Sequence, residues 1–155
     1  MTGKDKLKFI GKVTVAHIVS YMVCGIIFMQ IFDYMNFTQN DVSWRKLEDD
    51  WIIRLAPLFQ IIRGVLFGVV LLLIKDCFMN KKLGWLKLWT IIATLCIFNT
   101  SSTCPGSIEG FVYLIPSDEP FRVKLGGTLE ILTQTLLFSL IVTLKRPRKN
   151  VLPES

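Results

Sequence analysis

Four long apolar runs alternate with shorter polar stretches along the chain. About 20 helical residues cross the hydrocarbon core of a bilayer, so runs of this length predict membrane-spanning helices. The expected spans cover residues 9–32, 51–74, 83–101 and 125–144. The third run is the shortest, and Trp85 and Trp89 near its start are typical of anchors at the membrane–water interface. We therefore expect an all-α, integral membrane four-helix bundle that forms one membrane domain over residues 1–155.

Composition agrees with this interpretation. Hydrophobic residues make up 52% of the chain, and the mean hydropathy is +0.49. Both values are more apolar than those of ordinary soluble domains, so the lipid bilayer is the first expected partner. The first run is longer than the hydrophobic part of a removable signal peptide, and no small-residue cleavage pattern follows it. We expect this run to remain as a helix.

Basic residues gather on one side of the expected bundle. Because Lys and Arg are retained on the cytoplasmic side, they predict its orientation. Ten flank the spans on the side of the termini, namely Lys4, Lys6, Lys8, Lys75, Lys81, Lys82, Lys145, Arg146, Arg148 and Lys149. The opposite loops hold four, namely Arg45, Lys46, Arg122 and Lys124. We expect a plasma or inner membrane protein with both termini in the cytoplasm. The net charge of +6 follows from this topology and gives no reason to expect a nucleic acid partner.

Arg63 lies near the middle of the second apolar run. A guanidinium remains charged at any usable pH, and placing it in mid-bilayer costs from about 3 to over 10 kcal/mol, depending on the reference system. It therefore requires a polar partner or water. Gln60, one helical turn earlier, shares the same helix face. The two residues predict a polar patch that faces the interior of the bundle.

Polar residues of the other runs extend this predicted patch. A helix rises about 1.5 Å per residue. On this measure, Glu130 and Gln134 of the fourth run lie at depths that the side chain of Arg63 can reach. Thr133 shares their helix face, and His17 and Tyr21 form a polar face on the first run. The expected ligand-binding residues are Arg63, Gln60, Glu130, Gln134, Thr133, Tyr21, His17 and Glu109.

The second outer loop, residues 100–124, contains turn residues followed by a short apolar segment that carries Glu109. Two interpretations remain open. The segment is either a lid or re-entrant element that brings Glu109 to the pocket, or a short interfacial helix that rests on headgroups. Either interpretation adds a fifth, non-spanning helix to the expected fold.

Alternatives also remain open for individual residues. Arg63 and Glu130 suit a structural ion pair as well as a ligand site. His17 suits a hydrogen-bonded packing residue better than a metal ligand, because no second His or suitably spaced Cys accompanies it. Gly64 and Gly68 follow the small-xxx-small spacing, which permits the close approach of a helix from the same chain or from a homodimer. We expect no metal and no cofactor.

No sequence motif of a hydrolase, metalloprotease or phosphate-binding loop occurs, so we assign no catalytic residue and favour a non-enzymatic role. The leading hypothesis is a small membrane protein that transports or binds an anionic or zwitterionic solute in a polar intramembrane pocket. In this hypothesis Arg63 supplies the positive charge, and a homodimer encloses the path. The first alternative is an accessory or regulatory subunit of a larger membrane complex. The second is a membrane enzyme that acts on a lipid-soluble substrate.

Overall fold

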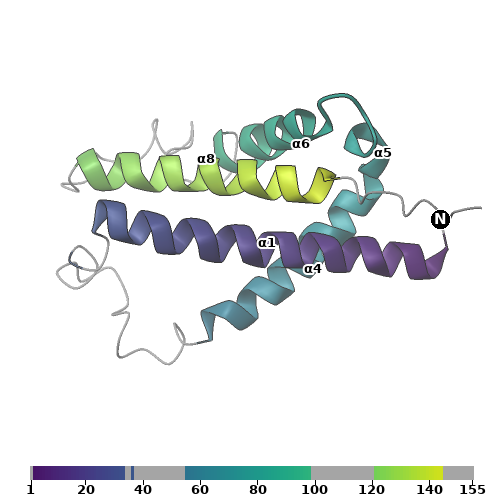
Figure 1. Ribbon diagram of the computed structural model, residues 1–155, viewed down its shortest axis with the longest axis horizontal. Helices are drawn as coiled ribbons and strands as arrows, with labels where there is room; N and C mark the ends of the chain where they lie inside the picture. Colours follow the sequence, from purple (N-terminus) through teal and green to yellow (C-terminus); the bar gives the residue numbers. More distant parts are fainter. Residues whose placement is uncertain (1, 34–35, 37–54, 99–120, 145–155) are drawn as a thin grey trace, which may run out of the picture.

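The chain is all-helical over the part that the computed structural model describes, residues 2–33, 36, 55–98 and 121–144 (Figure 1). The helices are α1 (Gly3–Phe32), α4 (Ala56–Leu73), α5 (Lys75–Phe78), α6 (Gly84–Ile92), the π-helix η1 (Ala93–Phe98) and α8 (Phe121–Thr143). Each of the four predicted apolar runs is helical over most of its described part, and the described residues contain no strand. The all-α prediction is confirmed for them.

Two helices are long and apolar enough to span a membrane, namely Gly3–Phe32 and Leu125–Thr143. The apolar helices Leu58–Leu73 and Gly84–Leu95 are shorter. The structure therefore contains two candidate spans rather than clearly four. The second predicted span is described only from Leu55 onward, and α4 begins with a proline in its first turn, where a missing backbone N–H costs nothing.

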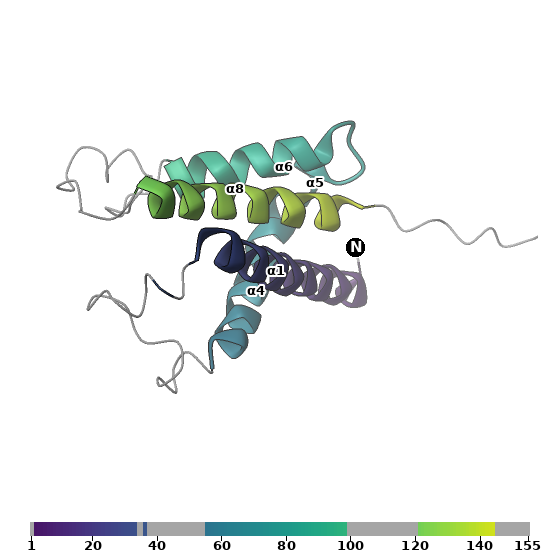
Figure 2. The same cartoon turned by 60° about the vertical axis from the view of Figure 1, so that its left-hand side comes forward.

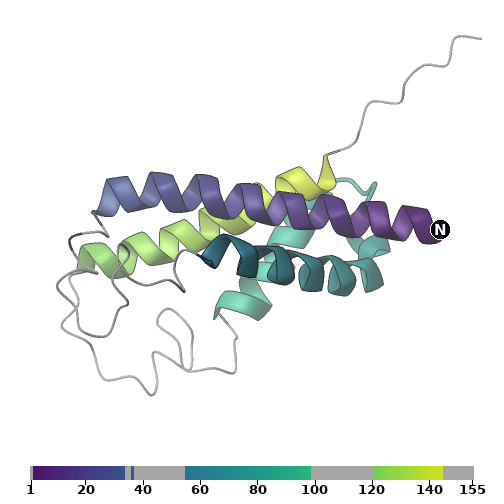
Figure 3. The same cartoon turned by 90° about the horizontal axis from the view of Figure 1, so that it is seen from below.

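Helix α1 occupies the centre of the fold. It packs on α4 and on α8, and α6 packs on the other side of α8 (Figures 1 and 2). Helix α8 runs antiparallel to α1 and ends near the N-terminal part of α1. Helix α4 crosses α1 at an incline in Figure 1 and lies alongside it when seen from below in Figure 3. The order in space is thus α4, α1, α8, α6.

Local sequence explains several helix boundaries. Thr2 and Asp5 form a capping box at the start of α1, in which each side chain bonds to the backbone N–H of the other. Helix α1 ends at Asp33, which adopts the left-handed conformation. Between α5 and α6 the chain turns so tightly that a Cβ atom at Gly84 would collide with the carbonyl oxygen of Phe78. Only glycine fits this position.

Two glycines bring α4 very close to α1. A Cβ atom added to Gly64 would lie 2.9 Å from the Cα of Thr14, and one added to Gly68 would lie 3.0 Å from the Cα of Ile10. Both glycines are buried. The small-xxx-small pattern therefore serves contact within the chain, and the surface considered for a homodimer at these two glycines is covered by α1.

The buried apolar core surrounds the N-terminal half of α1. Its members are Phe9, Val13, Ala16, Leu71, Phe78, Leu88, Ile92, Phe138 and Val142. Away from this core, large apolar side chains are exposed on α1, α4 and α8, including Ile27, Leu66 and Ile131. The described surface is consequently rich in hydrocarbon.

Replacing Gly64 with alanine is expected to destabilise the fold, because the added Cβ would press on the backbone of Thr14. Overpacking of this kind costs about 1–3 kcal/mol. Gly11→Ala on α1 is the matched control, since it has open space around it and alanine favours a helix over glycine by about 0.5–1 kcal/mol. Gly64→Ala should therefore lower the free energy of unfolding, and Gly11→Ala should raise it. Both values are measured by circular dichroism during SDS titration in micelles. Equal changes would contradict the close contact.

Candidate functional site

A buried hydrogen bond between two side chains joins α1 to α4. His17 Nε2 lies 3.0 Å from Gln60 Oε1, so His17 donates this hydrogen bond in the tautomer that carries its proton on Nε2. The two residues are only 4% and 9% exposed. Polar groups at such burial require a hydrogen-bonding partner, and here each supplies the other. The structure thus brings together two residues that the sequence predicted for the site.

Three aromatic rings lie around His17. The His17 ring lies 5.3 Å from the ring of Phe67 on α4, 6.2 Å from that of Phe138 on α8 and 6.4 Å from that of Tyr21 on α1. The rings of Phe67 and Phe138 are themselves 5.9 Å apart. His17 is therefore a hydrogen-bonded residue at the junction of three helices. Its predicted role in binding a ligand stays a prediction.

Arg63 does not face this junction. Its side chain is exposed, although Gln60 three residues earlier is buried. The face of α4 that contacts α1 carries Gln60, Gly64 and Gly68, spaced by four residues. At about 100° per residue, Arg63 lies roughly a quarter turn from the centre of that face. The prediction that Arg63 faces the interior of the bundle is therefore wrong, because the glycine contact fixes the rotation of α4.

Arg63 stands alone as a polar residue on its side of α4. We define the Arg63 face as Phe59, Ile62, Arg63, Leu66 and Val70, whose side chains are all exposed. Helical spacing places these five residues on one stripe. No hydrogen bond or salt bridge joins Arg63 to any residue that the structure describes, although its charge is close enough to act on the His17 ring. The Arg63 face is therefore an apolar stripe with one cation.

A second group of predicted residues lies along the seam between α1 and α8. A Cβ atom added to Gly25 would lie 3.8 Å from Glu130 Oε1, which places the carboxylate of Glu130 beside α1. The contact between Phe138 and His17 sets the same antiparallel register, and this register brings Gln134 to the level of Tyr21. Glu130, Gln134 and Tyr21 are half-buried. Three predicted site residues thus share one seam.

Thr133, by contrast, is exposed. The remaining predicted site residue, Glu109, lies outside the described residues together with the rest of the segment 99–120.

Arg63 and Glu130 lie at different levels of the bundle. Measured along α1, Arg63 lies about level with Thr14, because Thr14 contacts the adjacent Gly64. Glu130 lies opposite Gly25. About ten helical residues separate these levels, or roughly 15 Å along α1. The described geometry thus contains no Arg63–Glu130 pair. Among the described residues, moreover, no group of three His, Cys, Asp or Glu side chains is placed to hold a metal ion.

Lys12 makes a contact that the sequence analysis missed. Its Nζ atom donates to the carbonyl oxygens of Val142, at 2.6 Å, and Leu144, at 2.8 Å. The last carbonyls of a helix lack partners within the helix and carry partial negative charge, so a cation stabilises them. Lys12 therefore caps the C-terminal end of α8 from α1. Only its position inside an otherwise apolar run could have marked it, because the contact depends on the register of two helices far apart in sequence.

Gln60→Leu should leave the buried His17 ring without its partner and destabilise the protein by about 1–3 kcal/mol. His17→Leu should destabilise the protein by a similar amount, because it leaves the buried amide of Gln60 without its partner. The double variant leaves no unpaired polar group, so we expect it to be less destabilised than the sum of the two single variants. A double-mutant cycle on the free energies of unfolding measures this coupling. Strictly additive losses would show that the two side chains do not interact.

Lys12→Met keeps the apolar stem but removes the cap of α8, and should cost about 1–2 kcal/mol of stability. Amide hydrogen exchange in the last turn of α8 should accelerate, because that turn then frays more often. Lys8→Met, at an exposed position one turn earlier, is the matched control. The cap would be refuted if both variants left the exchange of α8 unchanged.

The described site residues form two separate groups. The His17–Gln60 pair and the α1–α8 seam lie between helices, whereas Arg63 lies on the outer side of α4. No family model, curated protein or solved structure matches the chain. The functional proposal therefore rests on the geometry of these two groups.

Proposed function

We propose that the chain is a four-span integral membrane protein that works as an accessory or regulatory subunit of a larger membrane complex. It docks on another integral membrane protein through the Arg63 face. The observation that carries this proposal is the exposed guanidinium of Arg63 on a stripe that is otherwise apolar. Both termini lie on the basic, cytoplasmic side of the membrane.

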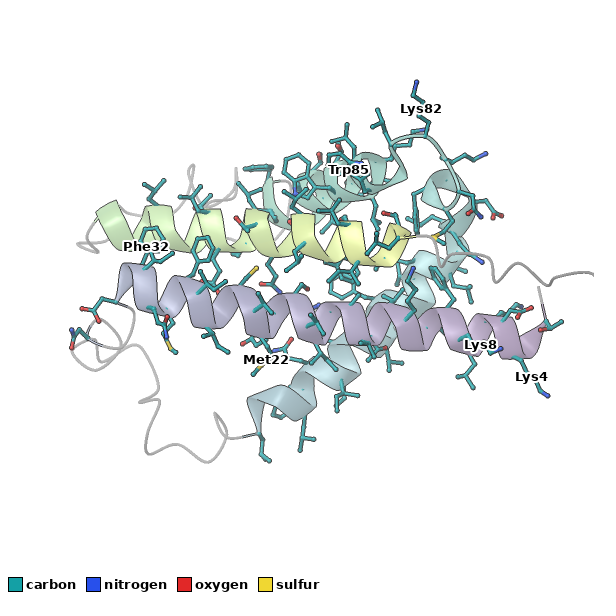
Figure 4. The ribbon with its side chains drawn as sticks, in the orientation of Figure 1. Lys4, Lys8, Met22, Phe32, Lys82 and Trp85 are labelled. Carbon is teal, nitrogen blue, oxygen red and sulfur yellow. The ribbon has the colours of Figure 1, made fainter. Side chains whose placement is uncertain are left out.

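Surface composition supports the membrane location. Large apolar side chains are exposed on all three long helices, such as Ile27 on α1, Leu66 on α4 and Ile131 on α8. Hydrocarbon on several sides of a small protein suits contact with acyl chains. Lys4, Lys8 and Lys82 lie toward the end of the molecule opposite Phe32, as Figure 4 shows. This grouping supports a single orientation, with that end in the cytoplasm.

Arg63 supports docking over solute transport. The transport hypothesis places its guanidinium in an interior pocket, but the side chain lies on the outer side of α4. The buried polar pair of His17 on α1 and Gln60 on α4 is already hydrogen-bonded, and aromatic rings lie against His17. The solute-binding hypothesis now depends on three residues of the α1–α8 seam, namely Glu130, Gln134 and Tyr21. An unpaired guanidinium in hydrocarbon is costly, and a protein partner removes that cost.

Photo-crosslinking in the native membrane tests the proposal. A photoreactive residue at Leu66, in the Arg63 face, should link to one identifiable integral membrane protein. The yield should fall several-fold in an Arg63→Ala background, because the guanidinium no longer contributes to the contact, and Arg63→Lys should retain part of it. The matched control places the same residue at Ile27 on α1, which is also exposed but lies outside the Arg63 face.

Two results would contradict the proposal. Crosslinks from Leu66 to lipid or to other copies of the chain alone would remove the larger partner. Release of the chain from membranes by an alkaline wash would remove the membrane location itself.

A further inference from the structure

We infer that the Arg63 face binds a membrane helix of a different protein, one that carries a single Asp or Glu at the depth of Arg63 between apolar residues. This inference rests on the proposed function and specifies the chemistry of the partner. It follows from the charge of the Arg63 face, from the direction in which Arg63 points and from the depth of the chain's own carboxylate.

Charge complementarity identifies the recognition group. A guanidinium presents five N–H donors in a planar fork, which matches the two oxygens of a carboxylate. A hydroxyl or amide can accept one of these bonds but leaves the positive charge unneutralised. Phe59 and Ile62 on one side of Arg63, with Leu66 and Val70 on the other, surround it with exposed apolar side chains. The complementary surface is therefore a helix that is apolar on both sides of one acidic residue.

The direction of α4 favours a protein carboxylate over a lipid phosphate. Gly64 contacts Thr14 and Gly68 contacts Ile10, so α4 runs antiparallel to α1 and its C-terminus lies at the basic end. Side chains on a helix lean toward its N-terminus. Arg63 therefore leans away from the basic end and toward the N-terminal end of α4. The phosphates at the basic end lie behind it, whereas a carboxylate level with the first turns of α4 lies in its direction.

The depth of Glu130 argues against a second copy of the chain. Glu130 is the only acidic residue within the described parts of the four spans. It lies roughly 15 Å further from the basic end than Arg63, measured along α1. Two copies inserted with the same orientation keep this offset, so Arg63 of one copy does not meet Glu130 of the other. Among the described residues, therefore, no carboxylate of a second copy meets Arg63, and the partner carboxylate is assigned to another protein.

Designed transmembrane peptides test the inference directly. The full-length chain, labelled with a donor fluorophore at its amino terminus, is reconstituted in phosphatidylcholine vesicles with acceptor-labelled leucine-rich peptides. These carry one Glu at the depth of Arg63, one Glu a full turn or more away from that depth, or Gln in place of Glu. The matched-depth Glu peptide should associate about tenfold more tightly than the Gln peptide, the size expected for one polar contact between membrane helices.

Variants of the chain separate charge pairing from a structural effect. Arg63→Leu should abolish the preference for the Glu peptide, and Lys87→Met, which removes an exposed cation from α6, should preserve it. Arg63→Glu should reverse the preference toward a peptide that carries Arg at the matched depth. A structural defect would lower association with every peptide and would give no reversal.

Each remaining outcome overturns the inference. Equal association of the Glu and Gln peptides would show that the Arg63 face does not recognise a carboxylate. Energy transfer between two labelled copies of the chain that depends on Arg63 would identify a homodimer. Arg63-dependent stabilisation by phosphatidylglycerol vesicles, with no peptide association, would identify a lipid phosphate. If a native partner is crosslinked but lacks an acidic residue at this depth, the inference fails while the proposed function stands.

Discussion

The close contact between α1 and α4 determines where the polar groups of α4 lie. Gly64 and Gly68 let the two backbones approach, with Thr14 and Ile10 on the opposite side. This contact leaves no freedom for α4 to rotate, because any larger side chain at the crossing would meet backbone atoms. Gln60 is consequently carried to His17, and Arg63 is carried to the outside. One steric constraint thus separates two polar residues that are a single helical turn apart.

Specific contacts along α8 set the register of the α1–α8 pair. Apolar side chains alone tolerate sliding between two long helices, since one aliphatic contact replaces another at little cost. At three levels of the α1–α8 pair, more specific contacts resist such sliding. Lys12 reaches the last carbonyls of α8, the His17 ring meets Phe138, and the carboxylate of Glu130 lies beside Gly25. A shift by one turn would disturb all three together.

The sequence predicts the helices better than it predicts their orientation. Apolar length and periodicity suffice to place helices in the four runs, because a buried backbone must satisfy its own hydrogen bonds. The spacing of Gln60 and Arg63 puts them on neighbouring sides of α4, but it does not say which side is covered. Gly64 and Gly68 hold that information, since they extend the stripe of Gln60 at intervals of four residues. Combining the glycine pattern with the position of Gln60 would have placed Arg63 outside.

Lys12 and Glu130 show a different limit of sequence reasoning. The partners of Lys12 are backbone carbonyls, which every residue type carries, so no motif in α8 marks them. The depth of Glu130 depends on where α8 begins relative to α1. The assumption that the second and fourth apolar runs begin at the same depth places Glu130 too close to Arg63. Both relations arise from contacts between residues more than 100 positions apart in the sequence, which residue spacing alone does not encode.

The capping of α8 by Lys12 has a consequence for biogenesis. The acceptors of this lysine belong to α8, the last described helix along the chain, while the lysine itself is in α1, the first. Until α8 has been synthesised, the ammonium group of Lys12 therefore has neither of these carbonyls to receive it. The two helices can reach their final register only after α8 has formed, so this contact is completed late in synthesis rather than with the formation of α1.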